Sequence, residues 1–148
     1  MGMTVLSDLT ILEYIQSGRL LIDPFSQQSL GPSGYDLRSA SPLSISPGGH
    51  QLAHTLETVE VGSMVCGQLF LRSSFAREGL LGSFALVDPG FRGQLTLSLS
   101  NMGSSPIEVD EGERLAQIIF TKLDREPQKT YSGRYQNSSG AVASRRCF

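Results

Sequence analysis

The chain has 148 residues and a mass of 16.0 kDa, the size of one domain that can fold without disulfide or metal cross-links. Twelve Lys and Arg residues against fourteen Asp and Glu residues give a net charge of -2, which argues against nucleic acid or an anionic membrane as a partner. No apolar stretch approaches the roughly 20 residues of a membrane-spanning helix, and the first residues form no signal-peptide pattern. We therefore expect a single cytoplasmic domain over residues 1–148.

The first expected element is one short helix near the amino terminus. Ser7 or Asp8 can cap its start, and Gly18 stands where helices commonly end. Ile11 and Ile15 fall on one helical face. No later segment has helical spacing of comparable quality, so the sequence predicts strands from this point onward.

From Leu20 onward, the sequence consists of short runs in which apolar and polar residues alternate, separated by Gly, Pro, Ser and Asn. This pattern is typical of an all-β domain. The most regular strand is predicted over residues 94–101, with leucines on one face and polar side chains on the other. Further strands are predicted over residues 64–71, 107–109 and 115–122. About eight to ten strands would suit a barrel-like sandwich or jelly roll.

The last segment differs from the rest of the chain. Residues 127–148 are polar, rich in Ser and Gly, and have few apolar side chains. Such a composition is typical of a segment with no core of its own. We interpret it as a C-terminal arm that closes over a ligand.

The common motifs of nucleotide and hydrolytic chemistry are missing from the sequence. It contains no P-loop, no GxGxxG after a strand, no HExxH and no GxSxG. The zinc deaminase signature is also missing, because no paired cysteines follow His54. We interpret His50 and His54 as polar loop or strand residues rather than metal ligands.

Four short segments are more polar and more glycine-rich than strands require: GYDLRSA at 34–40, RSSFAREGL at 72–80, VDPGFRGQ at 87–94 and GERLAQIIF at 112–120. Their order and spacing resemble those of the trimeric dUTPases and metal-independent dCTP deaminases. The resemblance implies a dUTPase-like distorted jelly roll or β-clip barrel with a short N-terminal helix, assembled as a homotrimer. Both ends of the chain, 6–25 and 131–145, look like the deaminase branch.

Arg72, Ser73 and Ser74 bring a guanidinium fork and two hydroxyls to one short turn, an arrangement that suits a polyphosphate. Without the resemblance, an exposed turn with a surface salt bridge is the simpler interpretation. The resemblance implies that this segment contacts the nucleotide phosphates together with Gln117. It also implies that Asp36 orients an arginine or a metal-bound phosphate, although an ordinary turn residue remains an equal alternative.

Asp88 begins a tight Asp-Pro-Gly corner, where an Asx-type turn residue would be the ordinary interpretation. In the trimeric dUTPases that this chain resembles, the matching Asp is the general base that positions the attacking water. Phe91 stands where those enzymes have an aromatic ring against the deoxyribose, which would exclude a ribose 2′-hydroxyl. The resemblance further implies that hairpin backbone groups read the base.

The deaminase branch has a glutamate in the strand after this hairpin, and the matching residue here is Ser98. The alternation of the strand places Ser98 on the same polar face as Gln94 and Thr96. A serine hydroxyl without a basic neighbour in the motif cannot take a proton from water near neutral pH. Loss of a general base typically removes about two to four orders of magnitude of rate, so we expect deamination to be crippled.

Four further positions bear on the same question. Ser138 stands where deaminases typically carry a glutamine, which weakens the resemblance to them. Arg134 and Tyr135 remain in the arm and are expected to contact the nucleotide. Arg77, which orients the attacking water in deaminases, is retained and favours the deaminase interpretation.

The leading hypothesis is a dUTP diphosphatase, a hydrolase that converts dUTP and water to dUMP and diphosphate, with Mg²⁺ held mainly by the substrate phosphates rather than by protein ligands. The first alternative is a dCTP deaminase, or a bifunctional dCTP deaminase and dUTPase, in which another carboxylate such as Glu57 or Glu60 replaces the missing one. The second is a non-catalytic, nucleotide-binding regulatory trimer.

Overall fold

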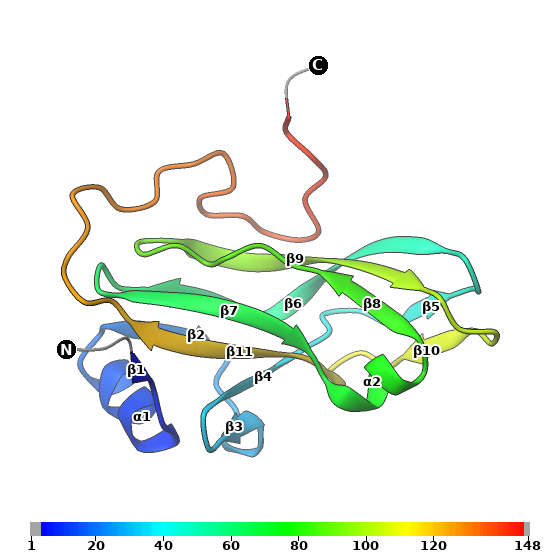
Figure 1. Ribbon diagram of the computed structural model, residues 1–148, viewed down its shortest axis with the longest axis horizontal. Coiled ribbons are helices and arrows are strands. Elements are labelled where there is room, and N and C mark those ends of the chain that lie inside the picture. Colours follow the sequence, from blue (N-terminus) through cyan, green and yellow to red (C-terminus); the bar gives the residue numbers. More distant parts are fainter. Residues whose placement is uncertain (1–3, 147–148) are drawn as a thin grey trace.

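The computed structural model describes residues 4–146, so the outermost residues of the expected domain and arm lie outside it. Two helices, one 3-10 turn and eleven strands are formed in this part of the chain (Figure 1). In chain order they are β1 Thr4–Val5, α1 Asp8–Gln16, β2 Leu20–Asp23, η1 Gln27–Ser29, β3 Leu30–Gly31, β4 Gly34–Arg38, β5 Leu43–Ile45, β6 His50–Val61, β7 Val65–Leu71, α2 Ser73–Arg77, β8 Leu80–Ser83, β9 Arg92–Asn101, β10 Ile107–Val109 and β11 Arg114–Lys122.

The strands form three sheets, which confirms the all-β prediction. One sheet has the order β1-β11-β4-β3 with β7 also paired to β11, a second has the order β2-β6-β9-β8, and β10 pairs with β5. Every pairing between these strands is antiparallel. Within residues 4–146 none of these sheets closes on itself, so the fold is a sandwich of open sheets rather than one closed barrel.

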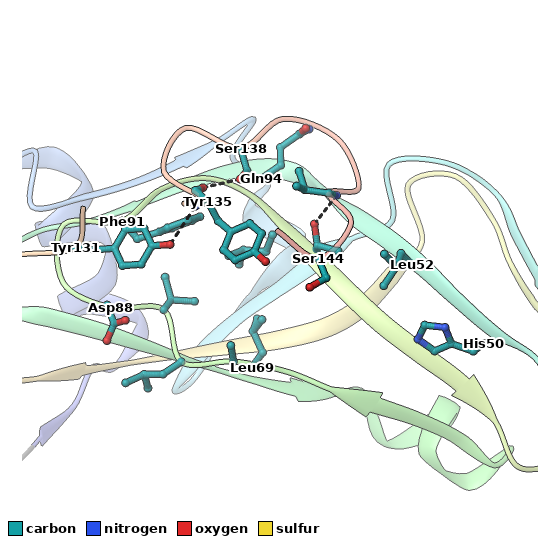
Figure 2. A pocket seen from close by; sticks show the side chains of 16 residues that line it. His50, Leu52, Leu69, Asp88, Phe91, Gln94, Tyr131, Tyr135, Ser138 and Ser144 are labelled. Carbon is teal, nitrogen blue, oxygen red and sulfur yellow. Dashed lines mark hydrogen bonds between the residues drawn. The ribbon is translucent and has the colours of Figure 1, made fainter. Parts of the chain in front are cut away.

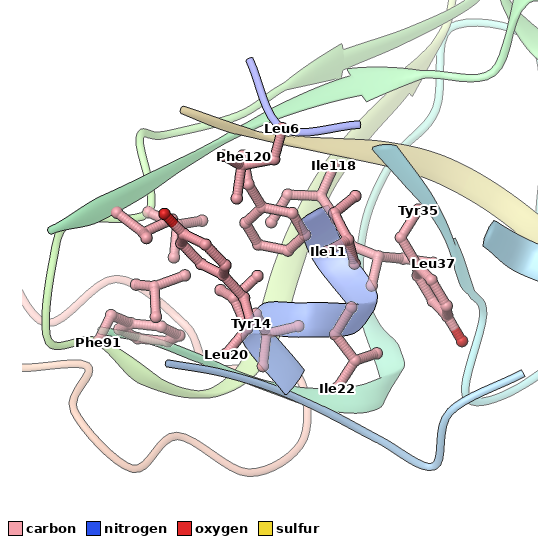
Figure 3. Close-up of a cluster of buried hydrophobic side chains, with 14 of the residues drawn as sticks. Leu6, Ile11, Tyr14, Leu20, Ile22, Tyr35, Leu37, Phe91, Ile118 and Phe120 are labelled. Atoms are coloured by element: carbon pink, nitrogen blue, oxygen red, sulfur yellow. The ribbon is translucent and has the colours of Figure 1, made fainter. Parts of the chain in front are cut away.

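Helix α1 confirms the one helix predicted from the sequence. Ser7 caps it by accepting a hydrogen bond from Thr10 N–H at 3.4 Å, and Gly18 follows it with φ of +72°. Ile11 and Tyr14 are buried. Figure 3 shows that they pack in one cluster with side chains of the strands. The helix thus closes one end of the sandwich.

Helix α2 was not predicted, because the segment after Arg72 was interpreted as a turn. Ser73–Arg77 forms five residues of helix, and Phe75 within it is buried against a second apolar cluster. The first residues of so short a helix leave backbone N–H groups without intrahelical partners. The two serines therefore begin a helix and do not lie in an open turn.

Strand β9 confirms the alternation expected over residues 94–101. Leu97 and Leu99 are fully buried and Leu95 is nearly so, whereas the polar residues between them are only partly covered. On one side β9 pairs with β6 along most of its length; on the other, β8 pairs only with residues 98–101. The part of β9 before residue 98 is therefore not paired with β8 on this side, and other segments of the chain can pair with it.

The described helices include none that is long and apolar enough to cross a membrane.

Candidate active site

A cavity of about 590 Å³ lies between β9, the loop that follows β8, and the C-terminal arm (Figure 2). Apolar side chains form most of its wall, and a few polar groups face it from β9 and the arm. The residues that line it are His50, Leu52, Leu69, Ala85, Leu86, Val87, Asp88, Phe91, Gln94, Leu95, Thr96, Tyr131, Tyr135, Ser138, Val142 and Ser144.

Asp88 is held on a tight turn at the rim of this cavity. The N–H of Phe91 donates to the Asp88 carbonyl at 3.0 Å, and Gly90 has φ of +88°. A Cβ atom added at Gly90 would lie 2.6 Å from Thr130 Cβ, so the turn also needs glycine where the arm crosses it. Among the described residues that line the cavity, Asp88 alone carries a carboxylate.

Phe91 forms a fixed wall of the cavity. Its side chain is 7% exposed and meets the Tyr131 ring edge-on, with 5.6 Å between the ring centroids. Buried aromatic pairs of this kind hold each other in place. Because Tyr131 packs against the Phe91 ring, the ring cannot move aside and limits the size of a group that binds next to it.

Gln94 and Thr96 present polar groups to the cavity from β9, as the alternation predicted. Backbone groups of alternate residues point to the same side of a strand. On the side away from β6, Gln94 N–H donates to the arm carbonyl of Ser138 at 2.9 Å, while Ser98 pairs with Ser83 of β8. Thr96 lies between Gln94 and Ser98 in the strand. Its main-chain N–H and C=O therefore point to the same side as theirs, into the gap between β8 and the arm.

Ser98 has no basic neighbour within its motif, but the fold brings one to it from another strand. His50 Nε2 lies 2.8 Å from Ser98 Oγ, and the imidazole lines the cavity. His50 and Ser98 come from adjacent strands and are 48 positions apart in the chain. Only the register of β6 against β9 brings them together, so the sequence offered no signal for the pair.

The carboxylates considered as replacements for the missing glutamate are engaged elsewhere. Glu57 is fully buried and accepts hydrogen bonds from the backbone N–H of Arg38 at 2.9 Å and from its Nε at 2.7 Å. The hydrogen bond between the two side chains also raises the pKa of the Arg38 guanidinium. Glu60 pairs with Arg92. Neither carboxylate lines the cavity, which argues against both as the base in the deaminase alternative.

The arm supplies the remaining polar wall. Tyr135 and Ser138 line the cavity, whereas Arg134 does not and instead donates to the carbonyl of Arg145 at 2.6 Å. The Tyr135 hydroxyl accepts from Arg145 N–H at 3.0 Å. The arm therefore lies folded along β9 of its own chain (Figure 1).

A second polar group, here called the arginine cluster, consists of Asp36, Arg72, Arg114 and Gln117. Asp36 Oδ2 lies 3.3 Å from Arg72 Nε and 3.7 Å from Arg114 Nη1, and Gln117 is the register partner of Asp36 between β11 and β4. Arg114 was missed from the sequence, although it stands in the same segment as Gln117. No member of the cluster lines the cavity.

Three other predicted site residues lie outside the cavity as well. Ser73 and Ser74 are exposed at the start of α2, directly after Arg72. Arg77 is exposed in the last turn of the same helix. Within one chain, the predicted residues other than Arg134 therefore form two separate groups, one at the cavity and one around Arg72 and α2.

A smaller cavity of about 380 Å³ adjoins the larger one, and Leu86, Asp88 and Tyr131 line both. Cys66 lines it, and burial raises the pKa of its thiol, with the charge of Asp88 acting in the same direction. The described chain contains no group of three or more His, Cys, Asp or Glu side chains placed to hold a metal ion.

Solved structures of known proteins share this fold. A 2′-deoxycytidine 5′-triphosphate deaminase from Agrobacterium tumefaciens aligns with a TM-score of 0.71 at 18% identity, covering 82% of this chain and 49% of that one. The dUTPase of EIAV aligns with a TM-score of 0.62 at 22% identity, covering 78% of this chain and 98% of that one. These likenesses confirm the dUTPase-like fold predicted from the motifs.

Similar sequences carry both kinds of name. A dCTP deaminase of Pyrococcus horikoshii is 44% identical over 142 residues, which cover 86% of this chain and 91% of the relative. A dUMP-forming dCTP deaminase of Hydrogenobaculum is 34% identical, with 95% of each chain covered. A probable deoxyuridine 5′-triphosphate nucleotidohydrolase of Sulfolobus islandicus rod-shaped virus 1 is also 34% identical, over 93% of this chain and 96% of the relative.

The family model described as dCTP deaminase-like matches residues 39–123, which include β9, the hairpin before it and α2. The model covers more than half of the chain, and the relatives cover most of it. Together with the fold, these matches establish that the chain belongs to the dCTP deaminase-like family of nucleotide-metabolising enzymes.

Proposed function

We propose that this protein is a dUTP diphosphatase, which hydrolyses dUTP to dUMP and diphosphate. The observation that carries the proposal is that Asp88 is the sole carboxylate in the described wall of the large cavity. A carboxylate on a stiff turn at the rim of an apolar cavity can act as a general base for water. Position 98, where the related deaminases have a glutamate, holds a serine.

The reaction needs one proton acceptor. A water molecule attacks the α-phosphorus, its oxygen forms the new bond, and the bond from that phosphorus to the bridging oxygen breaks to release diphosphate. Asp88 takes the proton of the attacking water. Mg²⁺, bound mainly through the phosphate oxygens, would neutralise the developing charge.

The cavity wall suits a pyrimidine deoxynucleoside. Phe91, fixed by Tyr131, would lie against the sugar and leave no room for a 2′-hydroxyl. The main-chain N–H and C=O of Thr96 face the gap between β8 and the arm. A donor and acceptor side by side can pair with the O4 and N3–H edge of uracil.

The phosphates require cations that this cavity does not present. Among the described lining residues none is Lys or Arg, whereas Arg72 with Ser73, Ser74 and Gln117 lies in or beside the arginine cluster. We therefore propose a homotrimer of about 48 kDa, three chains of 16.0 kDa, in which the cluster of one chain completes the cavity of another. Arg134 and Tyr135 of the arm would contact the nucleotide in the same site.

A second candidate function is dCTP deamination, favoured by the position of His50. An imidazole 2.8 Å from Ser98 Oγ could take a proton from water in place of the absent glutamate. Exposed Arg77 is the other feature in its favour. This candidate ranks second because Glu57 and Glu60 are engaged with arginines and position 98 holds a serine.

The deciding experiment is incubation with dUTP and, separately, dCTP in the presence of Mg²⁺, followed by chromatography of the nucleotides and an ammonia assay. We expect dUMP and diphosphate from dUTP and no ammonia from dCTP. Release of dCMP would instead indicate a pyrophosphatase of relaxed base specificity. Ready ammonia release would favour His50 as a base, and binding without turnover would favour a regulatory trimer.

A further inference from the structure

One side chain of the arm, Gln136, holds the hairpin before β9 through both ends of its amide. Its Oε1 accepts from the N–H of Arg92 at 2.9 Å, and its Nε2 donates to the carbonyl of Gly90 at 2.8 Å. Both partners are main-chain groups of the turn that carries Asp88. The amide thus ties the arm to the turn at the cavity rim.

The backbone on the carboxyl side of Gln136 continues the same contact. Asn137 N–H donates to the carbonyl of Arg92 at 2.8 Å, and Gln94 N–H donates to the carbonyl of Ser138 at 2.9 Å. Gly93 and Ser138 form an isolated parallel bridge. Since β8 covers only residues 98–101 of this edge, the arm pairs with the part of β9 that would otherwise be open.

A local turn makes both contacts possible at once. Asn137 has φ of +59°, and it is the one non-glycine residue with positive φ in the described chain. Asn adopts this region more readily than most residues. The bend allows the side chain of Gln136 and the backbone of the next two residues to face the same edge.

We propose that Gln136 is a positioning residue that clamps the arm over the cavity. The proposal rests on the proposed function, because Tyr135 and Ser138, the neighbours of the clamp that line the cavity, would contact the nucleotide. Opening the clamp frees the arm and removes these groups from the cavity. The chemistry at Asp88 does not require the amide itself.

The test compares Gln136→Ala with the wild type and with Gln128→Ala, the same change at an exposed arm residue outside these contacts. Limited trypsin digestion without nucleotide measures arm opening from the fragment cut after Arg134. The loss of two hydrogen bonds should accelerate this cut by about tenfold or more, whereas Gln128→Ala should match the wild type. Equal rates in all three proteins would overturn the proposal.

Steady-state kinetics then test the positioning role. Gln136→Ala should raise the KM for dUTP by about tenfold and lower kcat much less, since the arm contributes binding and not the base. Gln136→Glu keeps the acceptor for Arg92 N–H but has no donor for the Gly90 carbonyl. Its KM for dUTP should therefore lie between those of the wild type and Gln136→Ala. Faster cleavage with unchanged KM would overturn the positioning role. A wild type that does not hydrolyse dUTP would refute the proposed function, while the cleavage rates would still decide on the clamp.

Discussion

The cavity and the arginine cluster are held in different ways. The cavity is built from a glycine turn, a buried aromatic pair and an arm bonded along β9, all within one chain. The arginine cluster is an ion-pair group in which Arg72 and Arg114 keep about a third or more of their side-chain surface exposed. Exposed ion pairs contribute little to stability. Under the proposed function, the nucleoside end of the site would be complete in one chain, and the exposed arginine cluster would complete the site of another chain.

The largest expected effect comes from removing the base at the cavity. Asp88→Asn keeps the shape of the side chain but cannot take the proton of water, so kcat for dUTP should fall at least about a hundredfold while dUTP still binds. Titration calorimetry and diphosphate release measure the two separately. Asp124→Asn, the same change at an exposed residue outside the cavity, is the control. Retention of more than about a tenth of wild-type kcat would refute the assignment.

Mixing variants tests whether the two regions meet across chains. Arg72→Ala and Asp88→Asn should each be nearly inactive. When the two variants are unfolded and refolded together, the mixed trimers should regain about a quarter of wild-type activity, because one site in four combines an intact Asp88 of one chain with an intact Arg72 of another. Chains mixed without refolding are the control. Light scattering should give a mass of about 48 kDa, three chains of 16.0 kDa. A monomer, or no recovery in trimers shown to be mixed, would contradict the shared site.

Phe91 tests the cavity wall itself. Phe91→Ala removes the ring proposed to exclude a 2′-hydroxyl, so the preference for dUTP over UTP, as a ratio of kcat/KM values, should fall by about tenfold or more. Because both substrates meet the same variant, any loss of folded protein cancels in the ratio. An unchanged ratio would show that another group excludes ribonucleotides.

The sequence predicted those parts of the molecule that depend on local pattern. Alternation predicted β9 and its polar face, capping and spacing predicted α1, and the ordered motifs predicted the dUTPase-like fold. The short helix α2 was missed because five residues are too few for a periodic signal.

Contacts between distant strands could not be predicted in the same way. The approach of His50 to Ser98 and the burial of Glu57 against Arg38 depend on the register and irregularity of β6 against its neighbours. Strand register is fixed by packing and turn geometry over the whole sheet. A single sequence therefore indicated which residues are polar on β9 but not which groups face them.

The smallest expected effect concerns position 98. Ser98→Glu places a carboxylate on the polar face of β9, beside the His50 imidazole, and so introduces the residue type that the resemblance to dCTP deaminases implies at this position. Ser98→Gln, which has the same size and position but no carboxylate, is the matched control. We expect at most weak ammonia release from dCTP in the first variant and none in the second. Arg77 is retained, but Ser138 stands where the resemblance to deaminases implies a glutamine, and a misplacement of the new carboxylate by about 1 Å can cost around a hundredfold in rate. Deamination by the unmodified protein would contradict this argument, and its loss in His50→Asn would then identify the imidazole as the base.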